Sequence, residues 1–399
     1  MKVGLYQDPR GAGIGGGEYC LAVLARALRA EGHAVDLVHH QGERFADRLA
    51  VFFRTDLTGV GERNLPTLGR WDVPDVPAGR RGEAMRGWMR DVSSPYDVFV
   101  CMTHSPPPFN HARAGVMYVL FPFFDRRANW PWNTPGHGLG RVKAWWRKRV
   151  YEGWWSERMR SYAAVATLSE FARGWLRDYW GVDSAVVFPP VDVREFSPGD
   201  KEDRIVVLGR FTRVKKQAEL IAAFRRSRDR LPGWSFGCVG GLAEDNPADR
   251  EYFESVRRES EGVAELAANA PRERVRSELA RARVFWHAMG IDVDENRQPE
   301  RIEHFGIATV EAMAAGCVPV VVNRGGQREI VTHGETGFLC DSTDEFAERT
   351  AELAADPNRA AKMAAAAREQ AARFARPVFE AQMMSMLRPH LGPSREARP

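Results

Sequence analysis

Short apolar runs and segments with helical spacing alternate along the chain. The run Lys2–Tyr6 has the length of a buried strand. Tyr19–Gly32 spaces its apolar residues as a helix does and ends on glycine, and Ala34–Val38 is a second apolar run. A strand, a helix and a strand in this order form a unit with two parallel strands. The pattern therefore predicts an α/β fold with a doubly wound parallel sheet.

The same pattern stops once and then restarts. Four more predicted strands follow in the first half, at residues 96–102, 114–121, 163–169 and 184–190. Val193–Arg204 is polar, contains proline and glycine, and is predicted to be a linker. The second half is predicted to contain strands at 204–211, 234–241, 282–290 and 317–323, helices at 215–231 and 304–316, and two helices within 344–375.

The chain has 399 residues, which is too long for a single core. We therefore predict one domain over residues 1–200 and a second over 201–375. Residues 376–399 are predicted to be a helix that crosses back to the first domain, followed by a tail.

Composition narrows the class of protein. The five cysteines are scattered without a CxxC pair, which argues against zinc and against a disulfide scaffold and fits the reducing cytoplasm. The first residues are too polar for a signal peptide, and no apolar run approaches the ~20 residues of a membrane span. A net charge of +4 is mildly basic and does not by itself indicate nucleic acid.

The segment Ile302–Val320 carries the clearest chemistry. A predicted helix begins near Phe305–Ala308 and follows a strand, which is where open α/β sheets bind ligands and where helix N–H groups favour a phosphate. Glu303 lies just outside this helix, and Glu311 lies roughly 10 Å further on at ~1.5 Å per residue. A nucleotide sugar would satisfy both carboxylates through its sugar and ribose hydroxyls. The alternative is a capping Glu303 and a solvated Glu311.

A basic segment in the same half favours the ligand interpretation. Arg210 ends a predicted strand, and Lys215 and Lys216 begin the next helix. Cations at a helix N-terminus oppose the helix dipole, so a bound anion explains them better than solvation does. Such residues can hold a diphosphate as it gains charge.

Together these motifs resemble the retaining GT-B glycosyltransferases of family 4. Glu303 and Glu311 match the E-x7-E motif of that family, and "GRFTRVKKQ" resembles its G-R-x(n)-E-K-G element. "GGGEYCLAVLARALRAEGHAVDLV", "ATLSEFARGWL" and "VNRGGQREIVTHGETGFL" resemble three further elements in the family order. His287 and Met289, upstream of "EHFGI", resemble the eukaryotic dolichol-linked α-1,2-mannosyltransferase branch.

The resemblance implies two Rossmann-like domains facing across a cleft, with the donor mainly on the second and the acceptor on the first. Arg210 and a lysine would bind the diphosphate, and Lys216 aligns better than Lys215. Glu303 would hold the donor sugar and Glu311 the ribose. The other donor-binding positions implied are His304, Phe305, Gly306, Ile307, Gly16 and Gly17.

The implied reaction retains the anomeric configuration and uses neither a metal nor another cofactor. The motif Asp292–Asp294 resembles the metal-binding DxD of the other glycosyltransferase fold, and we interpret it here as a solvated loop. The implied partners are a nucleotide-diphosphate sugar, either GDP-mannose or a UDP- or TDP-sugar, and a glycan, lipid-linked or small-molecule acceptor. No nucleic acid is expected.

Two places depart from the family pattern or add to it. Leu120 stands where the family often has a histidine that touches the donor sugar. Either His104 serves instead, as a catalytic residue, or the donor lacks that contact. Residues 130–163 hold many tryptophans and basic residues, so the helix at 141–160 is predicted to touch an anionic membrane, to contact the acceptor, or only to pack on its own domain. The expected location is the cytoplasm, with peripheral contact at the inner membrane face if the helix touches lipid.

Two other classes of protein stay open at this point. One is a nucleotide-sugar-binding protein that has lost catalysis. The other is an NAD-dependent enzyme, based on the glycine loop Gly11–Glu18, but residues after the next strand offer no clear acidic partner for a ribose.

Overall fold

The computed structural model describes residues 1–7, 14–65, 80–125 and 139–392. These residues form two compact units, each with its own parallel sheet, which confirms the predicted α/β class. The first unit comprises Met1–Pro190 together with residues from Phe379 onward, and the second comprises Val191–Val378. The units thus divide at residues 190 and 378, where we had expected 200 and 375. The expected linker, Val193–Arg204, lies inside the second unit.

The described strands of the first unit form a seven-stranded sheet in the order β3-β2-β1-β4-β5-β6-β7. The strands are β1 Lys2–Gln7, β2 Ala34–His39, β3 Gly61–Asn64, β4 Val98–Thr103, β5 Ala114–Val119, β6 Ala164–Thr167 and β7 Ala185–Val186. The helices are α1 Gly16–Ala30, α2 Phe45–Phe53, α3 Arg80–Ser93, α4 Leu139–Arg160 and α5 Glu170–Trp180. Central β4 is buried along its whole length, as a strand covered on both faces must be.

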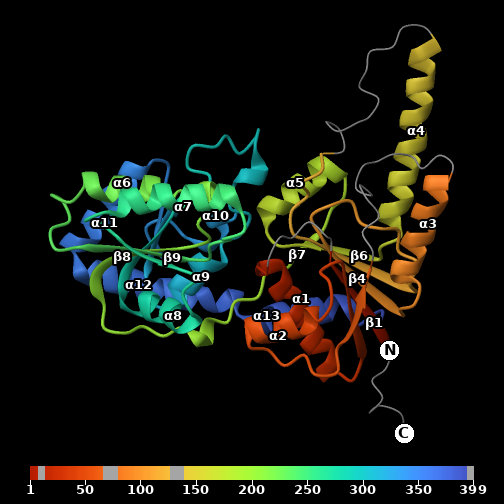
Figure 1. Ribbon diagram of the computed structural model, residues 1–399, viewed down its shortest axis with the longest axis horizontal. Helices are drawn as coiled ribbons and strands as arrows, with labels where there is room; N and C mark the ends of the chain where they lie inside the picture. The colour runs from red at the N-terminus through yellow and green to blue at the C-terminus, as the bar shows by residue number, and fades with distance from the viewer. Residues whose placement is uncertain (8–13, 66–79, 126–138, 393–399) are drawn as a thin grey trace. The chain divides into compact units, whose positions relative to one another are not determined.

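The helix α13, Arg376–Leu387, brings a distant part of the chain to the first unit. It lies beside α1 in Figure 1, and Glu380 pairs with Arg26 of α1. Phe379 meets Tyr118 of β5 edge to face, with ring centroids 5.9 Å apart. Residues 261 positions apart, Tyr118 and Phe379, therefore share one core, and an ion pair joins residues 354 positions apart.

The described strands of the second unit form a six-stranded parallel sheet in the order β10-β9-β8-β11-β12-β13. The strands are β8 Glu202–Leu208, β9 Ser235–Gly240, β10 Glu265–Ala268, β11 Ala282–His287, β12 Val318–Val322 and β13 Phe338–Cys340. The α-helices are α6 Gln217–Arg226, α7 Pro247–Ser260, α8 Arg272–Arg281, α9 Ile307–Ala314, α10 Gln327–Ile330, α11 Thr343–Ala355 and α12 Pro357–Ala371. The 3-10 turns are η1 Val193–Glu195, η2 Arg213–Lys215, η3 Pro299–Arg301 and η4 Ala372–Phe374.

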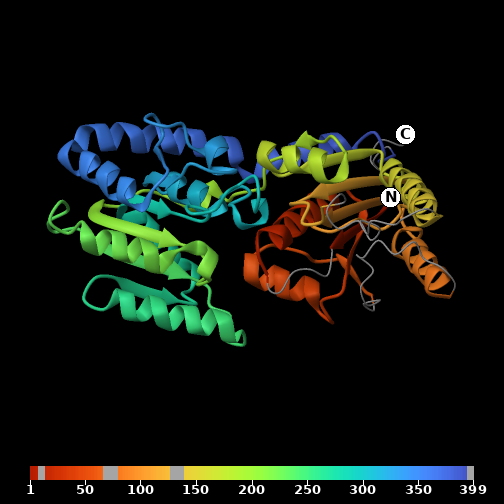
Figure 2. The same ribbon diagram turned by 90° about the horizontal axis from the view of Figure 1, so that it is seen from above.

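Helices cover both faces of this second sheet. Helices α6 and α7 lie on one face, and α8 and α12 lie on the other (Figure 1; Figure 2 shows the same layers from above). Strands β8, β9, β11 and β12 carry mainly apolar side chains that fill the core between the layers. Because all strands run parallel, their carboxyl ends share one edge of the sheet.

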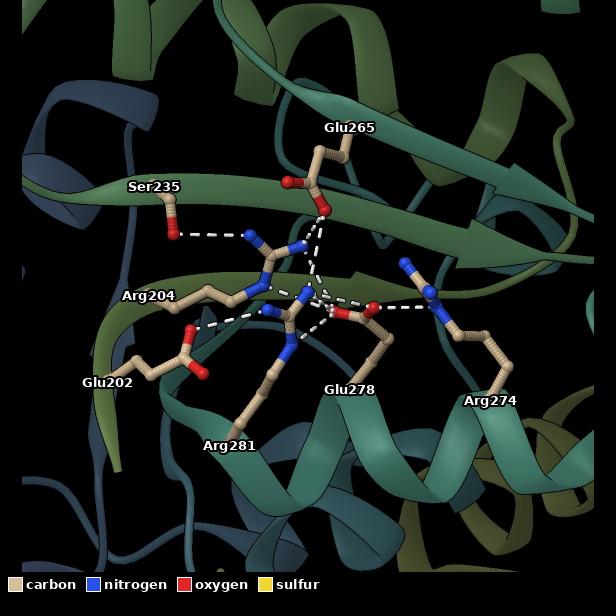
Figure 3. Close-up of polar contacts among 7 residues, drawn as sticks. All are labelled: Glu202, Arg204, Ser235, Glu265, Arg274, Glu278 and Arg281. Carbon is tan, nitrogen blue, oxygen red and sulfur yellow. Dashed lines mark hydrogen bonds and ion pairs between the residues drawn. The ribbon is translucent and has the colours of Figure 1, made fainter. Parts of the chain in front are cut away.

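The amino ends of these strands carry a buried charge network (Figure 3). Arg204 of β8 is almost fully buried and lies 3.0 Å from Glu278 and 2.7 Å from Glu265. Arg274 and Arg281 of α8 also pair with Glu278, at 2.7 and 2.9 Å. Gly237 leaves room for the network, because a Cβ there would come within 2.5 Å of the Arg204 guanidinium.

Candidate functional site

The N-terminus of α9 lies at the carboxyl edge of the second sheet. Its first turn follows Gly306, whose φ of +123° is a left-handed conformation that glycine adopts without strain. A Cβ at Gly306 would also come within 2.7 Å of the buried Gln327 amide. Gly325 and Gly326 lie equally close to the backbone of residues 303 and 304, and a Cβ at either glycine would clash with it. The amide of Gly326 donates a 2.9 Å hydrogen bond to the Glu303 carbonyl. Glycines therefore fix the backbone that carries Glu303.

The carboxylate of Glu303 is held by two partners. Lys215 Nζ lies 2.6 Å from its Oε2, and His287 Nε2 lies 3.0 Å from the same oxygen. Burial acts to raise the pKa of Glu303, but the Lys215 charge and the hydrogen bond from His287 outweigh it and hold the pKa well below its usual range. Glu303 is thus ionised at neutral pH, with its side chain still 17% exposed.

His287, the last residue of β11, is the buried partner. Burial lowers the pKa of His287 despite the neighbouring carboxylate, so the ring is neutral at pH 7. An ionised carboxylate only accepts hydrogen bonds, so the proton must lie on Nε2 and point at Glu303. This defines one cluster, Lys215–Glu303–His287, at the carboxyl ends of β8 and β11.

Glu311 lies in a second, separate pair on α9. Arg272, the first residue of α8, approaches Glu311 to 2.9 Å and Glu195 to 3.3 Å, and lies over the Phe196 ring at 4.8 Å. Burial raises the pKa of Glu311 above its usual value, although Arg272 opposes this. The two glutamates of the motif thus have pKa values shifted in opposite directions.

The structure separates the two adjacent lysines. Lys215 reaches Glu303, whereas Lys216 Nζ lies 2.7 Å from Asp292 and 3.1 Å from Glu219. Lys216, the residue we expected at the diphosphate, is therefore bound to two other carboxylates. Sequence spacing could not distinguish these neighbours, because both precede the same helix.

Arg210 lies just past the end of β8. Its side chain is exposed, and among the described residues it makes no ion pair. Gln217 donates a 2.9 Å hydrogen bond to its carbonyl and fixes the backbone there. An exposed guanidinium beside an ordered strand end can bind an anionic ligand.

The remaining donor-site positions contribute mainly backbone. The His304 ring is 3.3 Å from the Pro299 carbonyl, and buried Phe305 meets Phe374 edge to face at 5.4 Å. Ile307 is the first helical residue of α9. With these side chains packed against protein, the N–H groups of Phe305–Ile307 are what this turn can offer to a phosphate.

The first unit places its candidates at its own carboxyl edge. Gly16 and Gly17 begin α1, whose Glu18 accepts a 2.9 Å hydrogen bond from the Gly15 amide. Leu120 follows β5 directly and packs on Gly17, since a Cβ at Gly17 would come within 2.8 Å of it. The rest of the predicted glycine loop, residues 11–13, lies outside the described residues.

His104 follows the neighbouring strand β4. Its ring stacks on Phe123 with centroids 4.9 Å apart, and the Phe123 amide donates to its carbonyl at 3.1 Å. The Leu120 amide donates to the Thr103 carbonyl at 3.0 Å, so the ends of β4 and β5 are hydrogen-bonded together. His104 and Leu120 therefore occupy adjacent strand ends of the first unit.

The Asp292–Asp294 loop forms protein contacts. Asp292 pairs with Lys216, and Asp294 accepts a 3.0 Å hydrogen bond from the Asn296 amide. No group of three or more His, Cys, Asp or Glu side chains within the described ranges has the arrangement of a metal site.

Helix α4 carries two exposed tryptophans. Trp145 and Trp146 are 54% and 60% exposed, while Tyr151 and Trp155 are buried in the core of the first unit. The upstream tryptophans of the predicted segment, Trp130 and Trp132, lie outside the described residues. Among the residues that the structure describes, none of the helices is both long enough and apolar enough to traverse a bilayer.

Two residues of the site escaped sequence reasoning. His287 was noted only as part of a family pattern, and nothing marked it as a partner of Glu303. Arg272 had no signal at all, because it lies 39 positions from Glu311 and only the tertiary fold brings the two side chains together.

Comparison with known proteins gives consistent results. The model "Glycosyltransferase Family 4" matches residues 14–195, and "Glycosyl transferases group 1" matches residues 192–370. A GDP-Man:Man(3)GlcNAc(2)-PP-Dol alpha-1,2-mannosyltransferase from Dictyostelium discoideum is 29% identical over 243 residues, covering 55% of this chain and 46% of the relative. A GDP-mannose-dependent alpha-(1-6)-phosphatidylinositol monomannoside mannosyltransferase from Mycolicibacterium smegmatis is 35% identical over 209 residues, covering 48% and 50%. The chain thus spans about half the length of these curated relatives.

Solved structures show the same fold. A glycosyltransferase from Rickettsia africae superposes with a TM-score of 0.69 at 13% identity, covering 98% of this chain and 99% of that one. HepE from Anabaena, solved in complex with UDP and glucose, gives 0.69 at 17% identity, covering 98% and 100%. With two family models that together match residues 14–370 and a shared two-domain architecture, the chain belongs to the family 4 glycosyltransferases of the GT-B fold.

Proposed function

We propose that this protein is a retaining glycosyltransferase that moves a hexose from a nucleotide-diphosphate sugar to an acceptor hydroxyl. The observation that carries the proposal is the Lys215–Glu303–His287 cluster beside the N-terminus of α9. The cluster combines an ionised carboxylate that can bind sugar hydroxyls with a lysine that can bind phosphate. Arg210, which makes no ion pair among the described residues, follows β8 in the same unit.

The donor roles follow from these environments. Arg210 and Lys215 hold the diphosphate, with Lys215 taking the role that the sequence gave to Lys216. The amides of Phe305–Ile307 bind a phosphate at the helix N-terminus. Glu303 binds the sugar hydroxyls, and Glu311, held in place by Arg272, binds the ribose diol.

The reaction needs charge stabilisation at the leaving group. The bond between the anomeric carbon and the diphosphate oxygen breaks, and its electron pair leaves with the nucleoside diphosphate. The acceptor oxygen bonds to the same face of the sugar, and its proton passes to the departing phosphate. Arg210 and Lys215 stabilise the charge that develops there. His104 contacts the donor sugar in place of the family histidine, and no metal is required.

We base the proposed donor and acceptor on the names of the similar proteins. GDP-mannose is the first candidate because both mannosyltransferase relatives carry it in their names, and a UDP-sugar is the second because of HepE. The acceptor is a glycan, a lipid-linked sugar or a small molecule, and it binds at the carboxyl edge of the first unit.

Contact of α4 with an anionic membrane remains a prediction. Exposed Trp145 and Trp146 favour it, and buried Tyr151 and Trp155 show that the other part of the helix belongs to the core. We propose the cytoplasm, at the inner membrane face, as the place where the protein works.

A thermal-shift panel of UDP-, GDP- and TDP-sugars tests the donor site. One nucleotide should raise the melting midpoint of the wild type, because a ligand that binds only the folded state stabilises it. Glu311→Ala should lose this shift, whereas the exposed control Glu335→Ala should keep it. No shift with any donor would contradict the proposal.

The effective donor is then incubated with candidate acceptors, and the anomeric configuration of the product is read by NMR. A retained configuration formed in EDTA supports both retention and metal independence. Binding without transfer or donor hydrolysis would favour an inactive binding protein.

A further inference from the structure

The chain between β11 and α9 connects two members of the cluster. It leaves β11 at His287 and arrives at Glu303, so its path determines where both side chains lie. Ile291 and Val293 are buried, whereas the side chain of Asp292 between them is 60% exposed. Ile291 and Val293 thus anchor the connection in the protein interior, and Asp292 between them faces outward.

Lys216 reaches this connection from a conformation that side chains rarely adopt. Its φ is +61° and its ψ is +29°, in the left-handed region where a Cβ crowds the backbone. From there its Nζ lies 2.7 Å from Asp292 and 3.1 Å from Glu219. Burial acts to lower the pKa of Lys216, but hydrogen bonds to these carboxylates outweigh it and raise the pKa, so the ammonium is charged at neutral pH.

Stability alone does not account for this arrangement. An ion pair with a largely exposed aspartate contributes little to folding, and a left-handed lysine carries a conformational cost of similar size. The contact therefore adds little to the free energy of unfolding, and the position in which it holds Asp292 is the feature to explain. Its geometry offers the explanation, since Lys215 binds Glu303 and the next residue binds Asp292 on the same connection.

We propose that Lys216 is a positioning residue that holds the His287–Glu303 connection against the start of α6 and thereby sets Glu303 against Lys215. The far side of the connection has its own ties. Arg324 donates to the Val293 carbonyl at 3.2 Å, and Arg328 pairs with Glu295 at 2.9 Å. Lys216 supplies the tie on the α6 side. The effect of the Lys216–Asp292 ion pair on catalysis rests on the proposed function, whereas its effect on the position of the connection does not. We call this ion pair the tie.

Limited proteolysis tests the tie without any substrate. Arg297 lies in the connection with its side chain 84% exposed, so trypsin cleaves there once the segment loosens. Lys216→Met and Asp292→Asn should both speed cleavage after Arg297 by about tenfold. The digestion is carried out under native conditions, and mass spectrometry measures the fragments over time. Glu219→Gln removes the other partner of Lys216 and should leave the rate unchanged. Equal rates in all four proteins would overturn the proposal.

Kinetics test the consequence for the reaction. A displaced Glu303 weakens transition-state contacts, so Lys216→Met should lower kcat by about tenfold with little change in the donor KM. Asp292→Asn should match it, and the double variant should be no worse than either single one, because both remove one interaction. Lys216→Arg should restore most of the activity.

The opposite kinetic pattern would overturn the proposal. If Lys216→Met raised the donor KM while Asp292→Asn had no effect, Lys216 would bind the donor phosphate directly. Faster proteolysis of both variants in a protein that transfers no sugar would refute the proposed function and leave the tie standing.

Discussion

The second unit buries charge at both ends of its parallel strands, and the two ends differ in how that charge is matched. At the amino ends, three arginines and three glutamates neutralise one another, and Arg204 and Glu278 are each only 2% exposed (Figure 3). At the carboxyl ends, Lys215 and Glu303 keep 21% and 17% exposure, and Arg210 makes no ion pair within the described chain. Buried charge alone does not identify a ligand site. What marks the carboxyl ends as a candidate ligand site is the partial exposure of Lys215 and Glu303 together with Arg210, which makes no ion pair within the described residues.

The largest expected effect tests the amino-end network. Glu278→Ala removes the carboxylate that three arginines share and leaves Arg204 buried beside only Glu265. The free energy of unfolding should fall by about 3–5 kcal/mol, as it does when one partner of a buried pair is lost. Urea denaturation measures it. A loss below about 1 kcal/mol would mean that the network behaves like an exposed ion pair.

The next effect tests the carboxyl-end cluster. Glu303→Gln keeps the shape of the side chain and removes its charge, so sugar transfer should fall by about 10²-fold while the protein stays folded. Steady-state kinetics and circular dichroism are the measurements. Glu300→Gln, an exposed change on the same connection, is the matched control and should retain full activity. Equal activities of the two variants would remove Glu303 from the reaction.

A smaller effect distinguishes the two glutamates of the motif by pH. The folded-state pKa of Glu303 is depressed, so its stabilisation is present above the unfolded value near 4.5 and is lost as the pH falls through and below it. The folded-state pKa of Glu311 is raised, so its contribution declines as the pH rises above 4.5. Relative to wild type, Glu303→Gln should therefore lose stability as the pH rises towards 4.5 and change little above it, whereas Glu311→Gln should gain stability as the pH rises above 4.5. Parallel curves from urea denaturation would contradict these opposite shifts.

The smallest effect sharpens the comparison at the rim of the network. Glu202 pairs with Arg281 at 3.3 Å, and its side chain is 51% exposed. Glu202→Gln should change the free energy of unfolding by less than about 1 kcal/mol. The same urea assay compares it directly with Glu278→Ala. A large loss would show that the exposed rim and the buried centre act as one unit.

The sequence predicted those helices and strands whose apolar residues follow a regular local spacing. The apolar runs of β1, β2, β8, β9 and β12 and the helix after Gly306 follow local spacing, so they could be predicted. The short strand β3, Gly61–Asn64, has no apolar pattern and forms because β2 offers it a free edge. The boundary near residue 190 was missed because the second unit already begins at Val191, and the buried side chains of Val191 and Phe196 belong to that unit although Phe196 lies within a largely polar stretch.

The site shows the same limit. Glu303, Glu311 and Arg210 lie in recognisable motifs, so they could be listed in advance. Which lysine reaches Glu303 depends on the left-handed turn at Lys216, and spacing does not reveal a backbone angle. The Arg272–Glu311 pair depends on which helices become neighbours, and the charges of the amino-end network come from separate segments. These contacts are consequences of the tertiary fold.

The return of α13 to the first unit affects how the chain folds during its synthesis. Residues 191–378 form a contiguous unit that can fold as soon as they leave the ribosome. The first unit needs Phe379, Glu380 and their neighbours, which are made only after the whole second unit. A nascent chain therefore carries an incomplete N-terminal domain until synthesis is nearly finished, and the apolar surface near Tyr118 stays uncovered until Phe379 packs on it.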